Sequence, residues 1–253
     1  MIDEKYRLPM EQIGRYYNSI LNVCAGLLGK MGGRPWILNN RLSADFYVGL
    51  DVGGEKKARV ACYTFFDEFG NCVGEDWRPQ RAEEIDPPEL KRTIVNAIRS
   101  HREHIDSLVI HRDGEFTGKE LQGIQLVQSE LVEDGTMPKG SRIVCVNVKK
   151  AVPYRLYEIQ KEQKNGCRVG SCIILDDHSG ILATSGAPLL KQGTAQPMLI
   201  ELVPPFDKAD IKMMMKDLYY LSFMHWGSIL LKMKLPATLR YADALTHGSI
   251  SLF

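Results

Sequence analysis

Two aspartates stand where an apolar, strand-like segment of the sequence ends or is interrupted. Asp51 interrupts the segment 46–54, and Asp113 closes the segment 108–113. An ionised carboxylate in an apolar strand is unfavourable unless a partner compensates its charge, and a bound cation is a common partner. If the two strands are neighbours, the carboxylates form a site for a hard divalent cation. Such a site is typical of nucleases that hydrolyse phosphodiesters with metal ions.

The elements around these aspartates follow a βββαβα order. Apolar patterns predict three strands, and a helix then begins at Pro87-Pro88, because proline is tolerated in a first turn. A fourth strand and a second helix follow; the predicted ranges are 45–52, 58–66, 72–77, 87–102, 107–111 and 117–133. This order favours a mixed α/β sheet in which three strands meander and the fourth joins beside the first. Asp51 is then close to Asp113, although 62 positions separate them.

The flanking parts of the chain predict one helix before this unit and a mixed region after it. Residues 4–29 carry apolar side chains at helical spacing, and glycines and Pro35 end the pattern. The later elements are strands near 142–149, 154–160, 171–176 and 198–203, a helix over 207–224, and a short C-terminal segment rich in β-branched and aromatic residues. We therefore divide the chain into residues 1–36, a helix and connector, and residues 37–253, an α/β domain.

The composition is typical of a soluble protein of the cytoplasm. Of the 253 residues, 44% are hydrophobic and 25% are charged. The sequence has no secretion signal and no apolar window of about 18 residues, the length that crosses a membrane. Its six cysteines form no Cys-x-x-Cys motif, which favours reduced, buried thiols over a disulfide framework.

The net charge of +1 conceals a local excess of positive charge. Residues 138–175 hold eight basic side chains, Lys149, Lys150 and Arg155 among them, against two acidic ones. Alone, such a run fits a solvated face as well as a binding surface. Beside a carboxylate metal site, it indicates a groove for a phosphate backbone.

Six short segments occur in a characteristic order. They are 30–36, 49–52, 112–115, 146–150 with Arg155, 193–197 and 241–243. In this order and spacing they resemble the PIWI domain of Argonaute proteins, most closely the prokaryotic branch. The resemblance implies a ribonuclease-H-like α/β fold with a mixed central sheet, helices on its flanks and a C-terminal extension. It also implies a bound guide strand that selects a complementary target strand, of RNA or DNA, and often directs its cleavage.

Active members of this family use four residues, in the order Asp, Glu, Asp, and then Asp or His. Asp51 and Asp113 match the first and third positions. The second position lies on a glutamate finger, where Glu84 is the best match, followed by Glu83 and then Glu89. The alternative is that these acidic residues only serve the start of a helix, whose dipole favours negative charge.

The fourth position is matched best by His225, which has nearly the expected separation from the Tyr-Ala segment at 241–242. A histidine between a methionine and a tryptophan is also typical of a packed core residue, and Asp243 is the second candidate. With these ligands, the resemblance implies two divalent cations, Mg²⁺ or Mn²⁺, bridged by Asp51. They would activate a water and stabilise the leaving oxygen of a guide-directed endonuclease.

The resemblance further implies contacts with nucleic acid outside this centre. Lys149, Lys150 and Arg155 would hold the backbone of the bound strands, as would Gln192 and Thr194. Base pairing would then choose the target sequence. The terminal carboxylate of Phe253 would hold a metal on the 5′-phosphate of the guide, the alternative being an apolar tail packed on the core.

Residues 1–36 look like the last helix and connector of the domain that grips the 5′ end of the guide. The rest of that domain is not in this sequence. We therefore expect the chain to work with the missing domain, or with a partner subunit that supplies it.

Two other functions compete with a guided endonuclease. A catalytically silent PIWI module would bind guide and target and signal to a partner, and a resolvase-like nuclease would need no guide. The retained aspartates favour cleavage, and the segment 193–197 counts against a resolvase. A lysine or arginine that fills the space between the aspartates would argue against metal-dependent cleavage.

Overall fold

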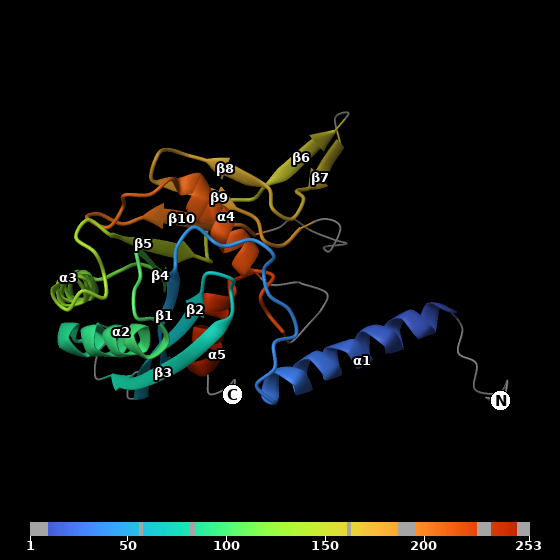
Figure 1. Cartoon of the computed structure of the whole chain (residues 1–253). Helices are drawn as coiled ribbons and strands as arrows, with labels where there is room; N and C mark the ends of the chain where they lie inside the picture. The colour runs from blue at the N-terminus through green and yellow to red at the C-terminus, as the bar shows by residue number, and fades with distance from the viewer. Residues whose placement is uncertain are drawn as a thin grey trace.

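The computed structural model describes residues 10–55, 58–80, 84–160, 163–186, 196–226 and 234–246 (Figure 1). The helices are α1 (Met10–Lys30), α2 (Pro87–His101), α3 (Gly118–Glu133), α4 (Ile211–Leu221) and α5 (Ala237–Thr246). The strands are β1 (Phe46–Glu55), β2 (Ala58–Asp67), β3 (Cys72–Gln80), β4 (Ser107–Asp113), β5 (Arg142–Lys149), β6 (Tyr157–Gln160), β7 (Gln163–Gly166), β8 (Cys172–Ile174), β9 (Ser179–Leu182) and β10 (Met198–Leu202). No helix within these ranges has the length and apolar character needed to span a membrane.

The central sheet has eight strands in the order β3-β2-β1-β4-β5-β10-β9-β8. Strands β1, β2 and β3 form the expected antiparallel meander, and β4 joins β1 in parallel. Strand β5 continues the parallel part beside β4, and β10 returns antiparallel to β5. The mixed α/β sheet and the neighbouring position of β1 and β4 are therefore confirmed.

Two apolar clusters cover the two faces of this sheet. One contains side chains of α2 and α3 with Phe46, Val48 and Leu50 of β1. The other contains side chains of α4 and α5 with Tyr47 of β1, Val109 of β4 and the alternate valines of β5. Because side chains of a strand alternate between faces, this pattern assigns each position of β1 to one face. Asp51, four residues after Tyr47, belongs to the face that α4 and α5 cover.

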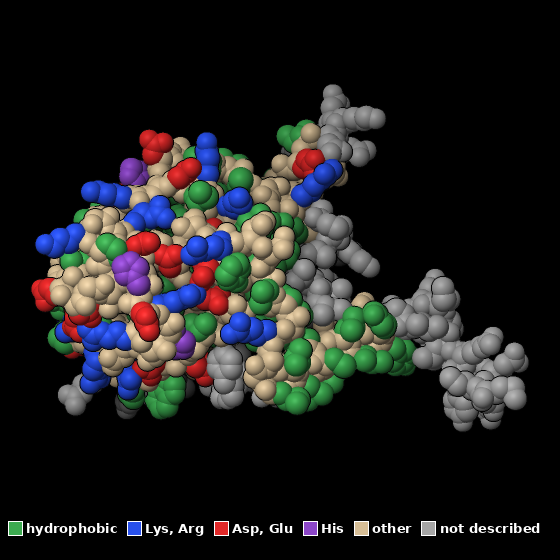
Figure 2. Space-filling model, viewed as in Figure 1, with side chains coloured by type: hydrophobic (Ala, Val, Ile, Leu, Met, Phe, Trp, Pro, Cys, Tyr) green, Lys and Arg blue, Asp and Glu red, His purple; other side chains and the backbone are tan. Residues whose placement is uncertain are grey.

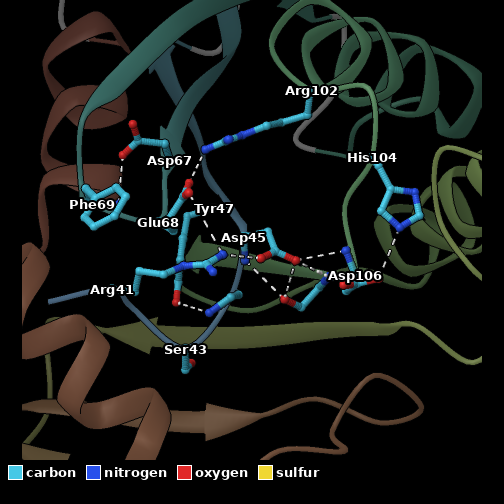
Figure 3. A network of polar contacts seen from close by, with 12 residues as sticks. Arg41, Ser43, Asp45, Tyr47, Asp67, Glu68, Phe69, Arg102, His104 and Asp106 are labelled. Atoms are coloured by element: carbon cyan, nitrogen blue, oxygen red, sulfur yellow. Dashed lines mark hydrogen bonds and ion pairs between the residues drawn. The ribbon is translucent and has the colours of Figure 1, made fainter.

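A polar network fixes the first residues of β1 against those of β4 (Figure 3). One carboxylate oxygen of Asp45 accepts hydrogen bonds from the backbone N–H groups of Asp106 and Ser107, at 2.9 and 3.0 Å. The other oxygen lies 2.7 Å from the guanidinium of Arg41. These contacts accompany a parallel register that runs from Phe46↔Leu108 to Leu50↔Arg112. The residues that directly follow this register are Asp51 and Asp113.

Two glycines of β1 allow α5 to lie directly on the strand. A Cβ atom at Gly49 would be 2.2 Å from the carbonyl oxygen of Thr238, and one at Gly53 would be 2.7 Å from Cβ of Thr246. Both glycines share a face of β1 with Asp51, because they lie two residues before and after it. The sequence Gly-x-Asp-x-Gly therefore brings the last described helix onto the aspartate.

The remaining elements differ from the expectations mainly near the C-terminus. The strand expected over 154–160 is β6, which pairs only with β7 in a separate two-stranded sheet. Helix α5 was not among the expected elements. Its ten residues are few for a sequence signal, and its position depends on packing against β1 rather than on local propensity.

Candidate metal centre and nucleic-acid interface

Three aspartates from distant parts of the chain meet at one end of the sheet. Asp51 lies on β1, Asp113 ends β4, and Asp243 lies on α5. One carboxylate oxygen of each can be chosen such that all three lie within 4.8 Å of one another. Asp51 is buried, with 8% of its surface exposed, and the other two are partly buried. Among the described residues, this is the acidic group suited to holding a metal ion.

The three carboxylates repel one another in a site of low exposure. Burial raises the pKa of Asp51, and the negative charges of Asp113 and Asp243 raise it further, while Arg112 and Lys150 oppose the shift. A divalent cation would remove this repulsion, and carboxylate oxygens are the ligands that Mg²⁺ and Mn²⁺ prefer. The residues present therefore fit such an ion.

Arg112 supports the aspartates from the opposite face of the sheet. Its Nε donates to Glu120 of α3 at 3.2 Å, and its Nη1 lies 2.7 Å from the carbonyl oxygen of Asp113 and 3.8 Å from Oδ1 of Asp51. Glu120 is held in turn by a capping box with Thr117 at the start of α3. This arrangement fixes the turn after β4, which carries Asp113.

Helix α5 contributes more than Asp243 to the centre. The hydroxyl of Thr246 lies 3.2 Å from Oδ2 of Asp51 and 2.8 Å from the carbonyl oxygen of Asp243. The guanidinium of Arg240 lies 3.3 Å from Oδ2 of Asp243. Sequence reasoning placed neither Thr246 nor Arg240 at the site.

A lysine lies between two of the aspartates. The Nζ of Lys150 is 2.7 Å from Oδ2 of Asp113 and 3.0 Å from Oδ1 of Asp243. Partial burial opposes the charged form of this amine, but the hydrogen bonds to Asp113 and Asp243 outweigh it and raise the pKa of Lys150. The sequence predicts that Lys150 contacts a nucleic-acid backbone, which stays a prediction; in the structure its ammonium contacts Asp113 and Asp243.

The structure does not bring His225 to this group. Its ring lies 6.0 Å from that of Tyr241, and its buried Nδ1 has no hydrogen-bond partner within the described ranges. Burial, followed by the charge of Arg240, lowers the pKa of His225 and keeps the imidazole neutral. Asp243, the second candidate for the fourth position, lies where His225 was expected.

The two described candidates for the glutamate finger, Glu84 and Glu89, are not grouped with the aspartates either. Glu84 is exposed and forms a 2.7 Å ion pair with Lys119 at the start of α3. Glu89, the third candidate, accepts a hydrogen bond from Gln80 at 2.9 Å. Glu83 lies outside the described residues.

The residues predicted to contact nucleic acid have different surroundings in the structure. Lys149 is neutralised by ion pairs with Glu115 and Glu201, at 2.5 and 2.7 Å. Arg155 is exposed, and its Nη1 donates to the carbonyl oxygen of Tyr154 at 2.8 Å. Gln192, Thr194 and Phe253 lie outside the described residues, so their predicted contacts stay predictions.

Lys234, which the sequence analysis did not single out, lies beside Lys150. Its Nζ donates to the carbonyl oxygen of Lys150. Burial lowers the pKa of Lys234, and the positive charges of Arg155 and Lys150 lower it further. The positive charges of Lys150, Arg155 and Lys234 are therefore close enough to repel one another.

Comparison with known proteins assigns this arrangement to a family. The sequence profile of the Piwi domain matches residues 7–249. The chain belongs to the Piwi domain family. The protein argonaute of Pyrococcus furiosus is 25% identical in an alignment of 247 residues that covers 90% of this chain and 29% of that protein.

Solved Argonaute structures share the fold. The Clostridium butyricum Argonaute bound to a guide DNA and a 19-mer target DNA superposes with a TM-score of 0.75 at 23% identity, over 96% of this chain and 32% of that one. The A. aeolicus Argonaute gives a TM-score of 0.68 at 21% identity, over 89% and 32% of the two chains. The expected ribonuclease-H-like PIWI fold, most like the prokaryotic branch, is confirmed. The chain spans about three tenths of the length of these relatives.

Proposed function

We propose that this PIWI domain is the catalytic part of a nucleic-acid-guided endonuclease that cuts the target strand. The observation that carries the proposal is the meeting of Asp51, Asp113 and Asp243 on one face of the sheet. Three carboxylates gathered in a partly buried site repel one another, and bound divalent cations would balance their charge.

The three aspartates share one role in this function. Asp51, Asp113 and Asp243 would hold the cations with their carboxylate oxygens. Divalent cations bound there supply an activated water and a stabilised leaving oxygen for phosphodiester hydrolysis. Asp243, rather than His225, takes the fourth position in this proposal, and Glu84 or Glu83 remains the proposed second carboxylate.

The protein side chains around the aspartates would orient the substrate. Lys150, Lys234 and Arg155 offer positive charge to a phosphate backbone, which fixes the position of a strand without reading its bases. Guide–target pairing would then supply the sequence choice.

The remaining parts of an Argonaute are the proposed partner of α1. This helix extends away from the sheet (Figure 1), and apolar side chains gather along it (Figure 2). Its exposed apolar residues are Tyr16, Tyr17, Ile20, Val23, Leu27 and Leu28, with Met31 directly after them. An exposed apolar surface of this extent is typical of a protein interface. A domain that holds the 5′ end of the guide, in the same protein or in a partner subunit, would cover it.

Metal binding tests the centre without requiring a guide. We expect Mn²⁺ titrated into the chain to bind, and Asp51→Asn and Asp243→Asn to weaken the binding at least about tenfold, which is about 1.4 kcal/mol. His225→Ala should bind Mn²⁺ like the unmodified chain. Normal binding by both Asn variants would reject the centre.

Cleavage is tested on a labelled target strand already annealed to a 5′-phosphorylated guide, which removes the need for loading. We expect Mn²⁺-dependent cutting of the target that disappears in Asp51→Asn while duplex binding is retained. Cutting by Asp51→Asn at the normal rate would contradict the proposal.

A silent PIWI module is the second candidate, because the ammonium of Lys150 already balances two of the aspartates. It predicts duplex binding without cleavage in any divalent metal. The same cleavage assay separates the two functions.

A further inference from the structure

Lys150 contacts the oxygens that a metal ion would need. Its Nζ lies within hydrogen-bond distance of both Asp113 and Asp243, and these two carboxylates form the cluster with Asp51. A Mg²⁺ ion binds carboxylate oxygens at about 2.0–2.1 Å, so it would have to sit among the same oxygens. An ammonium and a divalent cation cannot occupy that space together.

The position of Lys150 follows from the sheet itself. Asp113 pairs with Val148 in the parallel register of β4 and β5, and Val148 faces the cluster that α4 and α5 cover. Lys150 lies two residues further along the chain and reaches the same face, directly beside Asp113. Its neighbour Lys149 faces Glu115 and Glu201 instead.

The side chain of Lys150 is exposed enough to move from the carboxylates into solvent. It is 42% exposed, whereas the side chains of Asp113 and Asp243 are 8% and 19% exposed. Its backbone is held separately, because the carbonyl oxygen accepts a hydrogen bond from Lys234. A flexible four-carbon stem can therefore swing the ammonium toward solvent while the backbone stays in place.

We propose that Lys150 is an internal competitor of the catalytic cations, which holds Asp113 and Asp243 together without metal and leaves them when metal binds. The proposal rests on the metal site of the proposed function. When metal displaces the ammonium of Lys150, the ammonium moves to the surface and lies with Arg155 and Lys234 beside the site. Metal binding thereby changes the charge of that surface. The metal-loaded state therefore presents one more free positive charge to a phosphate backbone than the metal-free state.

Mn²⁺ binding to the full chain, measured by the EPR signal of free Mn²⁺, tests the competition. Lys150→Met removes the charge and keeps most of the side-chain volume; we expect it to bind Mn²⁺ at least about tenfold more tightly. Its metal-free form should melt at a lower temperature, and Mn²⁺ should raise its melting temperature more than that of the unmodified chain. Lys149→Met is the matched control and should leave the Mn²⁺ affinity unchanged.

Each result has a distinct meaning. If Lys150→Met binds Mn²⁺ only as tightly as the unmodified chain, or more weakly, the competition is overturned and the metal site is left intact. Absence of binding in both overturns the competition and the metal site together. Binding only by Lys150→Met supports the competition and rejects metal-dependent cleavage by the unmodified chain.

A measurement on the unmodified chain covers the case in which Lys150→Met does not fold. NMR of ¹⁵N-labelled lysine side chains reports each slowly exchanging ammonium, and Mg²⁺ is diamagnetic. We expect saturating Mg²⁺ to shift or broaden the Lys150 signal and to leave the Lys149 signal in place. An unchanged Lys150 signal in Mg²⁺-bound protein overturns the proposal.

Discussion

Replacing Gly49 with alanine tests whether α5 is held directly against β1. The new Cβ would lie 2.2 Å from the carbonyl oxygen of Thr238 and 2.6 Å from the hydroxyl of Thr64. Ordinary contact begins at 3.4 Å, so α5 has to withdraw by about 1 Å in a core packed as densely as a crystal. The 2.6 Å hydrogen bond from Thr64 to the Thr238 carbonyl would be lost with it.

The expected cost is at the upper end of the range for overpacked cores. Such substitutions cost about 1–3 kcal/mol, and here the obstacle is backbone rather than a flexible side chain. Alanine also restricts the conformations of the unfolded chain, which stabilises the folded state by about 0.4–1 kcal/mol and offsets part of this cost. We expect a net loss of about 2–2.5 kcal/mol, which lowers the melting temperature by about 4–10 °C in a domain of this size.

Thermal unfolding followed by circular dichroism measures this loss, and two further variants calibrate it. Gly53→Ala meets only the side chain of Thr246, at 2.7 Å, and should cost less. Gly118→Ala at the start of α3 meets nothing within 4 Å and should be neutral or slightly stabilising. If Gly49→Ala melts together with Gly118→Ala, α5 does not lie on β1 and the placement of Asp243 is wrong.

Three further predictions concern the residues that support the site and the sheet. Arg112→Met should lower the free energy of unfolding in urea by about 3–5 kcal/mol at pH 7, because Glu120 stays buried without a cation. Burial raises the pKa of Glu120, so this loss should shrink as the pH falls and Glu120 is protonated. A loss that does not depend on pH would contradict this prediction. Tyr47→Phe should cost about 1–3 kcal/mol, because its hydroxyl donates to buried Asp217 at 2.7 Å, whereas Tyr16→Phe on the exposed face of α1 should be neutral. Asp45→Asn should lower the free energy of unfolding at neutral pH. Burial raises the pKa of Asp45, but hydrogen bonds from Asp106 and Ser107 outweigh it and lower that pKa below its ordinary 3.8. The difference in unfolding free energy between the variant and the unmodified chain should therefore be constant above pH 3.8 and shrink as the pH falls through the lowered pKa.

The sequence was sufficient for the part of the site that depends on strand patterns. Apolar runs with β-branched residues predict β1 and β4, and the βββαβα order makes them neighbours, so Asp51 and Asp113 could be paired before the structure was known. The same alternation, extended through the β4–β5 register, would also have placed Lys150 on the face of Asp113. That inference requires the register, which the sequence does not provide.

The rest depended on tertiary packing that no local pattern contains. His225 and Asp243 were both plausible from spacing, and only the packing of α5 on the two glycines of β1 shows that Asp243 lies beside Asp51. A glycine on each side of Asp51, on the same face, is a signal that another part of the chain packs closely there, but it does not show which part. Glu84 lies before a proline-initiated helix, where an ion pair with Lys119 competes with any role at the centre.

The contribution of α5 sets the order in which the protein can become functional during its synthesis. Strands β1 and β4 and their aspartates leave the ribosome more than a hundred residues before Asp243 is added. Domains fold as their chain emerges, so the sheet can assemble before α5 and Asp243 have joined the acidic centre. A ribosome-bound chain that ends before α5 therefore lacks Asp243, and the group of three aspartates is complete only after α5 has been added.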